Sequence, residues 1–126
     1  MAENVGGACH SEDVTAKFKD LALDARDHQK LADWWCVALG YTRREAARSA
    51  DDPVPIVDVA GVGPLIWVNP VPEAKTVKNR MHLDVFGDVG ELVSLGAVLV
   101  RNKGADIDWW VMADPEGNEF CVFEPR

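Results

Sequence analysis

The chain has 126 residues, 48% of them apolar, which is enough for one domain or for two small modules that share a core, but not for two independent domains. Its 13 basic and 21 acidic residues give a net charge of −8, which disfavours binding to nucleic acid and to anionic membrane surfaces. The apolar runs fall far short of the roughly 20 residues that cross a bilayer, and the N-terminus lacks a secretory signal, so we expect a cytoplasmic protein without a membrane partner.

The first half of the chain predicts one strand, one helix and three short strands. Residues 1–13 carry little that could be buried and are expected to form a disordered tail. Apolar and polar residues roughly alternate over residues 17–25, which predicts a strand. Asp27 is an N-cap candidate, apolar residues then recur at helical spacing over residues 28–39, and Gly40 supplies a stop. Prolines and glycines separate three further strands, predicted at residues 42–46, 56–59 and 65–68.

The second half repeats this order after a connector. Residues 69–79 contain two prolines and three lysines and are expected to cross the surface as a linker. Residues 80–86 alternate like a strand, and residues 87–97 leave room for little more than two helical turns. Further strands are predicted at residues 98–101, 109–113 and 119–124, the last after a DPEGN turn. Both halves therefore have the order βαβββ.

Short sequence matches support an internal duplication. Residues 23–25 match residues 83–85 at an offset of 60, and residues 38–40 match residues 94–96 at an offset of 56. The smaller second offset predicts that the second helix is about one turn shorter than the first. We expect a single domain over residues 14–126, with one module at about 15–68 and the other at 80–126.

Four segments carry a resemblance to a known family: residues 24–41, 78–85, 94–97 and 114–124, the last reading DPEGNEFCVFE. Together they resemble the vicinal oxygen chelate superfamily, and most closely its glyoxalase-like domains, which are related to bleomycin resistance proteins. The resemblance implies an α+β fold of two tandem βαβββ modules, whose strands curl into an open, incomplete barrel with a concave cleft. Period-two alternation predicts which side chains face that cleft: Phe18, Asp20, Ala22, Asp24, Arg80, His82, Asp84, Phe86, Glu119, Cys121 and Phe123.

The resemblance also implies positions for a metal site, because metal-dependent members hold a divalent cation with four His or Glu ligands from the first and last strands of each module. Carried over, these positions fall on Asp20, Trp67, Arg80 and Cys121. Arginine has no lone pair to offer, and tryptophan offers only an N–H group. We therefore expect no metal and no cofactor. His82 could complete a set with Asp20 and Cys121, but the Arg80 charge would then lie beside the metal.

The leading functional hypothesis is a metal-independent, glyoxalase-like protein that binds a small organic molecule. Trp67 and Phe86 would provide stacking surfaces, and the predicted ligand-binding residues are Asp20, Asp24, Trp67, Arg80, His82, Asp84 and Cys121. We also expect an ion pair between Arg80 and Asp20, or between Arg80 and an anionic ligand.

Two alternatives remain open at this stage. The first is a metal-free lyase or isomerase in which His82 is the catalytic acid or base, Asp84 or Asp24 orients it, and Arg80 stabilises an enolate or a carboxylate. The second is a structural or partner-binding module with a filled cleft. In each case we expect a homodimer, because open edge strands and superfamily clefts are commonly covered by a second chain.

The three cysteines, Cys9, Cys36 and Cys121, show no CxxC spacing and predict reduced thiols rather than disulfides. Cys9 lies next to His10 and could be half of a metal site, although a disordered tail is the simpler interpretation.

Overall fold

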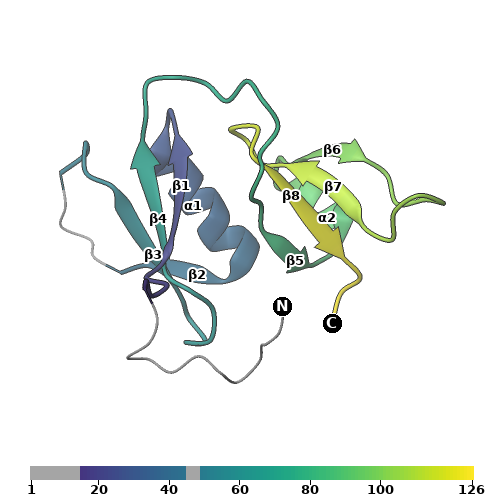
Figure 1. The fold of residues 1–126 in the computed structure, drawn as a ribbon, viewed down its shortest axis with the longest axis horizontal. Coiled ribbons are helices and arrows are strands. Elements are labelled where there is room, and N and C mark those ends of the chain that lie inside the picture. The colour runs from purple at the N-terminus through teal and green to yellow at the C-terminus, as the bar shows by residue number, and fades with distance from the viewer. Residues whose placement is uncertain (1–14, 45–48) are drawn as a thin grey trace.

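The computed structural model describes residues 15–44 and 49–126, and Figure 1 shows their arrangement. The predicted tail, with Cys9 and His10, lies outside the described residues. The first module contains β1 (Leu21–Ala25), α1 (His28–Leu39), β2 (Tyr41–Arg43), β3 (Val54–Asp58) and β4 (Ile66–Pro70). The second contains β5 (Asp84–Phe86), α2 (Val89–Ser94), β6 (Val98–Arg101), β7 (Trp110–Ala113) and β8 (Glu119–Phe123). The predicted order βαβββ is confirmed in both modules.

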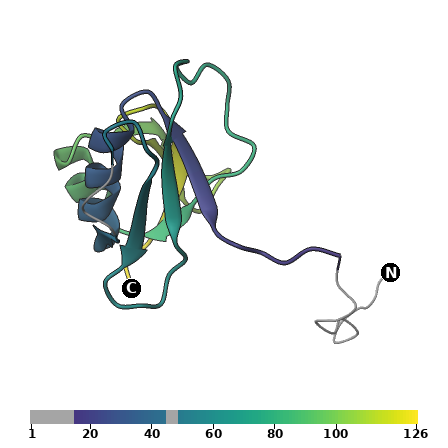
Figure 2. The same cartoon turned by 90° about the vertical axis from the view of Figure 1, so that its left-hand side faces the viewer.

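Each module forms one four-stranded mixed sheet with the same topology. The strand orders are β1-β4-β3-β2 and β5-β8-β7-β6. The pairs β1–β4 and β5–β8 are parallel, and the other neighbours are antiparallel. Figure 1 shows the two sheets next to each other, and Figure 2 shows both helices on one side of them. The fold is α+β with two repeated modules and no closed barrel, as predicted.

The first strand of each module is shorter than predicted. β1 begins at Leu21 rather than at residue 17, because its partner β4 begins at Ile66 and earlier residues have no strand to pair with. β5 begins at Asp84, opposite Cys121, rather than at residue 80, and the first two residues of β8, Glu119 and Phe120, have no partner in β5. Residues 80–83 therefore lead into the sheet without being part of it.

The two helices begin alike and end differently. Asp27 caps α1 by accepting from the Lys30 backbone N–H, and Asp88 caps α2 in the same way. α1 has 12 residues and ends at Gly40 in the left-handed region, with φ of 73°. α2 has only 6 residues, so it is shorter than α1 by more than the single turn predicted. Neither helix is long and apolar enough to span a membrane.

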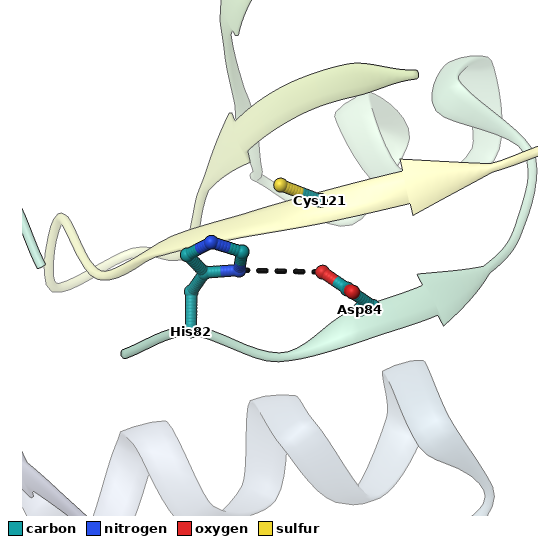
Figure 3. Close-up of side chains that lie close together, drawn as sticks. All are labelled: His82, Asp84 and Cys121. Atoms are coloured by element: carbon teal, nitrogen blue, oxygen red, sulfur yellow. Dashed lines mark ion pairs between the residues drawn. The ribbon is translucent and has the colours of Figure 1, made fainter. Parts of the chain in front are cut away.

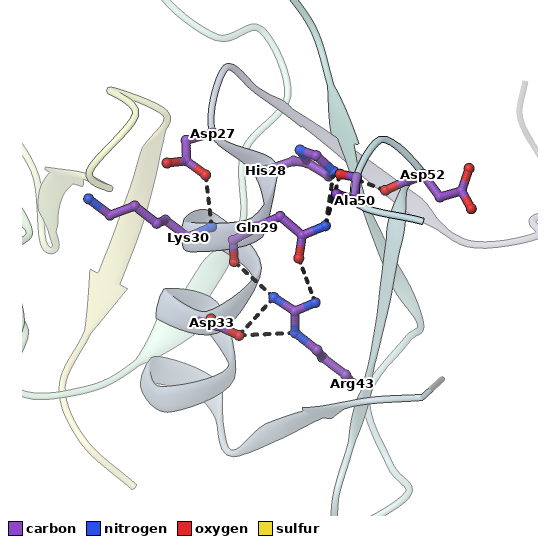
Figure 4. A network of polar contacts seen from close by, with 8 residues as sticks. All are labelled: Asp27, His28, Gln29, Lys30, Asp33, Arg43, Ala50 and Asp52. Carbon is purple, nitrogen blue, oxygen red and sulfur yellow. Dashed lines mark hydrogen bonds and ion pairs between the residues drawn. The ribbon is translucent and has the colours of Figure 1, made fainter. Parts of the chain in front are cut away.

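Polar contacts attach the start of α1 to the rest of the first module (Figure 4). The Arg43 guanidinium donates to the side-chain and backbone oxygens of Gln29, at 2.8 and 3.1 Å, and pairs with Asp33 at 3.0 Å. The buried His28 ring lies 2.9 Å from the backbone oxygen of Asp52. These contacts hold the helix against β2 and the following loop, so we assign His28 a structural role.

One apolar core spans both modules. Its largest buried side chains are Trp35 and Leu31 from α1, Ile56 and Val68 from the first sheet, and Met112, Phe120 and Val122 from the second. The rings of Trp35 and Phe120 meet edge to face, with centroids 5.0 Å apart. Because α1 packs against β8 as well as its own sheet, the modules share their hydrophobic stabilisation.

Polar contacts from the DPEGN turn also join the modules. The Trp35 indole N–H donates to Asp114 Oδ2 at 2.9 Å. Glu116 accepts the backbone N–H groups of Arg26 and Asp27 on its two carboxylate oxygens, at 3.0 and 2.9 Å. The turn of the second module therefore holds the residues at which α1 begins.

Candidate functional site

The strand ladders determine which residues of the two modules are equivalent. Trp67 lies opposite Ala22 in the β1–β4 pair, and Cys121 lies opposite Asp84 in the β5–β8 pair. Trp67 and Cys121 are counterparts because each lies between two buried core residues of the last strand of its module. Each also lies four residues after a glycine of the preceding turn, Gly63 or Gly117. Ala22 is therefore the counterpart of Asp84.

It follows that the counterpart of Asp20 is His82, not Arg80. The first strands correspond at an offset of 62 residues, whereas the tripeptide match had an offset of 60. Arg80 is exposed in the segment before β5, and within the described residues it makes no hydrogen bond or ion pair. The expected ion pair between Arg80 and Asp20 is wrong, because Asp20 pairs with Lys19 instead.

A cavity of about 340 Å³ lies where the edges of the two modules meet, and we call it the seam cavity. Its lining is mainly apolar and comes from β1, α1, β4, the segment before β5, and the start of β8. The lining residues are Phe18, Asp20, Leu21, Ala22, Leu23, Trp35, Ile66, Asn79, Met81, His82, Leu83, Asn118, Glu119 and Phe120. An enclosed, mostly apolar space with a few polar groups is typical of a small-molecule site.

Only two of the predicted ligand-binding residues, Asp20 and His82, line the seam cavity. Asp24 lies in a separate depression beside the linker and accepts from the Asn69 side chain at 3.4 Å. The remaining four, Trp67, Arg80, Asp84 and Cys121, are not part of the cavity lining. The sequence interpretation missed Asn79 and Asn118, which come from the linker and a turn rather than from a predicted strand.

Trp67 and Asp20 contact each other instead of converging on a common ligand. The Trp67 indole N–H donates to Asp20 Oδ2 at 2.9 Å, and Lys19 Nζ lies 2.9 Å from the same oxygen. The Lys19 hydrogen bond lowers the pKa of Asp20; burial opposes this, and the Trp67 bond adds to it. The Trp67 ring, expected to stack on a ligand, has Lys19 Nζ at 5.8 Å and Arg44 Cζ at 5.3 Å from its centroid.

Three possible metal ligands lie together in the second module (Figure 3). The donor atoms of His82, Asp84 and Cys121 lie within 4.8 Å of one another, and His82 Nδ1 is 3.3 Å from Asp84 Oδ1. Cys121 is 7% exposed, and burial raises the pKa of its thiol, as does the Asp84 carboxylate. A metal could bind there only after this thiol had lost its proton.

The four positions implied by metal-dependent relatives do not fit a shared cation. Trp67 has no lone pair to donate, and its N–H group is already bonded to Asp20. Asp20 is not part of the group formed by His82, Asp84 and Cys121. The first-module donor Asp20 is therefore not grouped with the second-module donors, and no chemical step is assigned to a metal at this set.

Two βαβββ modules that meet across a cavity are the arrangement that the resemblance to the vicinal oxygen chelate superfamily implies. The sequence profile of the glyoxalase-like domain matches residues 20–123, and the chain belongs to that family. No curated protein sequence matches the chain significantly.

Solved structures show the same fold at low sequence identity. FosX, a fosfomycin resistance protein from Listeria monocytogenes solved with Mn(II) and sulfate, aligns with a TM-score of 0.65 and 10% identity, over 90% of this chain and 93% of its own. TioX from Micromonospora sp. ML1 gives 0.55 and 18%, over 88% and 100%. TnmS3, an antibiotic-binding protein from Streptomyces sp. CB03234, gives 0.55 and 13%, over 90% and 99%. These likenesses establish the fold.

Proposed function

We propose that this protein binds a small, mainly apolar organic molecule in the seam cavity and that binding does not require a metal. The observation that carries the proposal is the cavity itself, about 340 Å³ in volume and lined mostly by apolar side chains of both modules. TnmS3, which has the same fold, is described as an antibiotic-binding protein. The mismatch between the four implied ligand positions and a cation supports the metal-independent part of the proposal.

The experiment is a titration with the uncharged fluorescent probe N-phenyl-1-naphthylamine. We expect one probe molecule per chain, with the same affinity before and after treatment with EDTA, and no stoichiometric Ni, Zn, Mn or Fe by elemental analysis of untagged protein. Ala22→Trp should fill the cavity and reduce affinity at least tenfold, whereas Ala105→Trp, on a loop outside the cavity, should not. Absence of probe binding, or binding lost with EDTA, would contradict the proposal.

A second candidate is a metal-free lyase or isomerase that uses His82 as its acid or base. It is supported by the position of His82 in the cavity lining and by the 3.3 Å contact between His82 Nδ1 and Asp84, which could fix the imidazole tautomer. Turnover of carbonyl or epoxide substrates that disappears in His82→Asn, while probe binding remains, would establish it. A module with a filled cleft is less well supported, because side chains leave about 340 Å³ of the cavity unfilled.

We further propose a homodimer in a reducing compartment, the cytoplasm. β6 forms the edge of the second sheet, and Val98, Leu99 and Val100 are all exposed on it. Cys36 and Cys121 are both free thiols, as expected where disulfides do not form. Analytical ultracentrifugation should give the mass of a dimer at micromolar concentration, and Val100→Lys should shift the distribution toward the monomer. A wild-type monomer under these conditions would contradict the dimer.

A further inference from the structure

The polar atoms of the seam cavity indicate the charge of its ligand. Five polar side chains line the cavity: Asp20, Asn79, His82, Asn118 and Glu119. Among the described residues that line it, none is a lysine or an arginine. The lining therefore contributes two carboxylates, whose lysine partners, Lys19 and Lys75, are not lining residues.

Each carboxylate has one oxygen engaged and one open. Asp20 Oδ2 accepts from both Lys19 and Trp67, whereas no described group donates to Oδ1. Glu119 Oε1 accepts from the Asn79 backbone N–H at 2.9 Å and from Lys75 Nζ at 3.0 Å, and the backbone N–H of Glu119 itself also acts on this carboxylate, whereas no other described residue donates to Oε2. The two side chains are only 12% and 17% exposed, so water has restricted access to the open oxygens.

Both carboxylates are ionised at neutral pH. Burial acts to raise the pKa of Glu119, but the Asn79 N–H group and the Lys75 ammonium outweigh it and lower that pKa. The pKa of Asp20 is also lowered, chiefly by Lys19. An enclosed carboxylate oxygen that lacks a donor favours a ligand that supplies one.

The amide of Asn118 adds a further acceptor. Its Nδ2 group donates to both oxygens of Asp114, at 3.3 and 3.1 Å, which leaves its carbonyl oxygen as the group without a described partner. The cavity thus offers four acceptor oxygens without a described partner from another residue, one each from Asp20, Asn79, Asn118 and Glu119. The donors that could balance them are limited to the Asn79 amide and His82 Nε2, depending on its tautomer.

We propose that the ligand of the seam cavity is a compact apolar or aromatic molecule that carries a protonated amine, attracted by the carboxylates of Asp20 and Glu119, which both line the cavity. This inference rests on the proposed binding function and adds the ligand class. The proposed ligand class also differs from the dihydroxypropylphosphonic acid that one structure of FosX holds. A phosphonate would place its negative charges beside two carboxylates, whose partners Lys19 and Lys75 are outside the lining and already bonded to those carboxylates.

The test is competition against bound N-phenyl-1-naphthylamine by three matched compounds: 1-naphthylmethylamine, 1-naphthylmethanol and 1-naphthylmethylphosphonate. They share one ring system and differ in charge. At pH 7 we expect the amine to bind about tenfold to a hundredfold more tightly than the alcohol, in line with a hydrogen bond to a charged group. The phosphonate should be the weakest competitor.

Two cavity variants and one control test whether the preference for the amine comes from the two carboxylates of the cavity. Asp20→Asn and Glu119→Gln should each weaken the amine at least fivefold and leave the alcohol unchanged, because they remove charge with little change of shape. Glu124→Gln, which removes an exposed carboxylate paired with Lys103, should change neither affinity.

Equal affinities for the amine and the alcohol, a preference for the phosphonate, or failure of all three to displace the probe would overturn the inference while leaving the proposed binding function intact. Failure of the probe itself to bind would overturn both.

Discussion

Replacing Trp35 with alanine is expected to lower the free energy of unfolding by about 3 to 5 kcal/mol. Trp35 is 2% exposed, packs against Phe120 across the module boundary, and donates its indole N–H to Asp114. The substitution therefore leaves a large void and an unpaired buried acceptor in the part of the core that both modules use. Urea unfolding followed by circular dichroism measures the effect.

Two further variants separate packing from hydrogen bonding. Trp35→Phe keeps an aromatic ring but loses the N–H group, and we expect a smaller loss of about 1 to 3 kcal/mol. Val37→Ala, on the exposed face of the same helix, should change the free energy by less than about 0.5 kcal/mol. If Trp35→Ala were as mild as Val37→Ala, the modules would not depend on this shared core.

Asp114→Ala is expected to cost about 3 kcal/mol or more, because several donors lose their acceptor at once. Asp114 is 2% exposed and accepts from the Trp35 indole, from the backbone N–H groups of Glu116 and Asn118, and from the Asn118 amide. Each donor left unsatisfied in a buried site costs about 1 to 3 kcal/mol. The same unfolding experiment measures the loss, and Asp106→Ala, at an exposed loop position, is the control.

The charge of Asp114 gives this prediction a pH dependence. Burial raises the pKa of Asp114, against the opposing hydrogen bonds from Trp35 and Asn118. The folded state therefore favours the protonated form of Asp114, and this preference stabilises the fold. The stabilisation is fully present below the pKa that Asp114 has in the unfolded chain, and it is lost as the pH rises through the raised pKa of the folded state. Wild type should gain stability relative to Asp114→Asn when the pH is lowered from 7 toward 4. A constant or opposite difference would contradict the raised pKa.

The local elements could be predicted from sequence because their signals are local. The N-cap Asp27, the apolar spacing of residues 28–39 and the left-handed Gly40 together define α1, and the structure gives the same bounds. Alternation and turn residues likewise identified the strands of both modules. Strand ends were less predictable, because they depend on pairing with a partner strand that is distant in sequence.

The residue-by-residue alignment of the two modules could not be determined from these local signals. Offsets of 60 and 62 residues have the same parity, so both keep every side chain on the same face of the sheet. Alternation therefore could not distinguish Arg80 from His82 as the counterpart of Asp20. Only the ladder, which pairs Ala22 with Trp67 and Asp84 with Cys121, makes the distinction.

The lining of the seam cavity could not be predicted from the sequence pattern either, because it depends on how the two modules pack against each other. Alternation places Leu21 and Leu23 on the opposite face of the strand from the predicted cleft residue Ala22, yet all three line the seam cavity. Asn79 precedes β5 at the end of the linker, where no periodicity predicts a direction. The hydrogen bond from its backbone N–H to Glu119 is a long-range contact that no local sequence motif predicts.

The contacts of the DPEGN turn also determine when the chain can become stable during synthesis. The two backbone N–H groups at the start of α1 are bonded by Glu116, 90 and 89 residues later, and the Trp35 indole is bonded by Asp114, 79 residues later. On the ribosome, the first module therefore emerges well before the groups that complete it. The part of its apolar helix face that includes Trp35 therefore stays uncovered until the last hairpin has been synthesised.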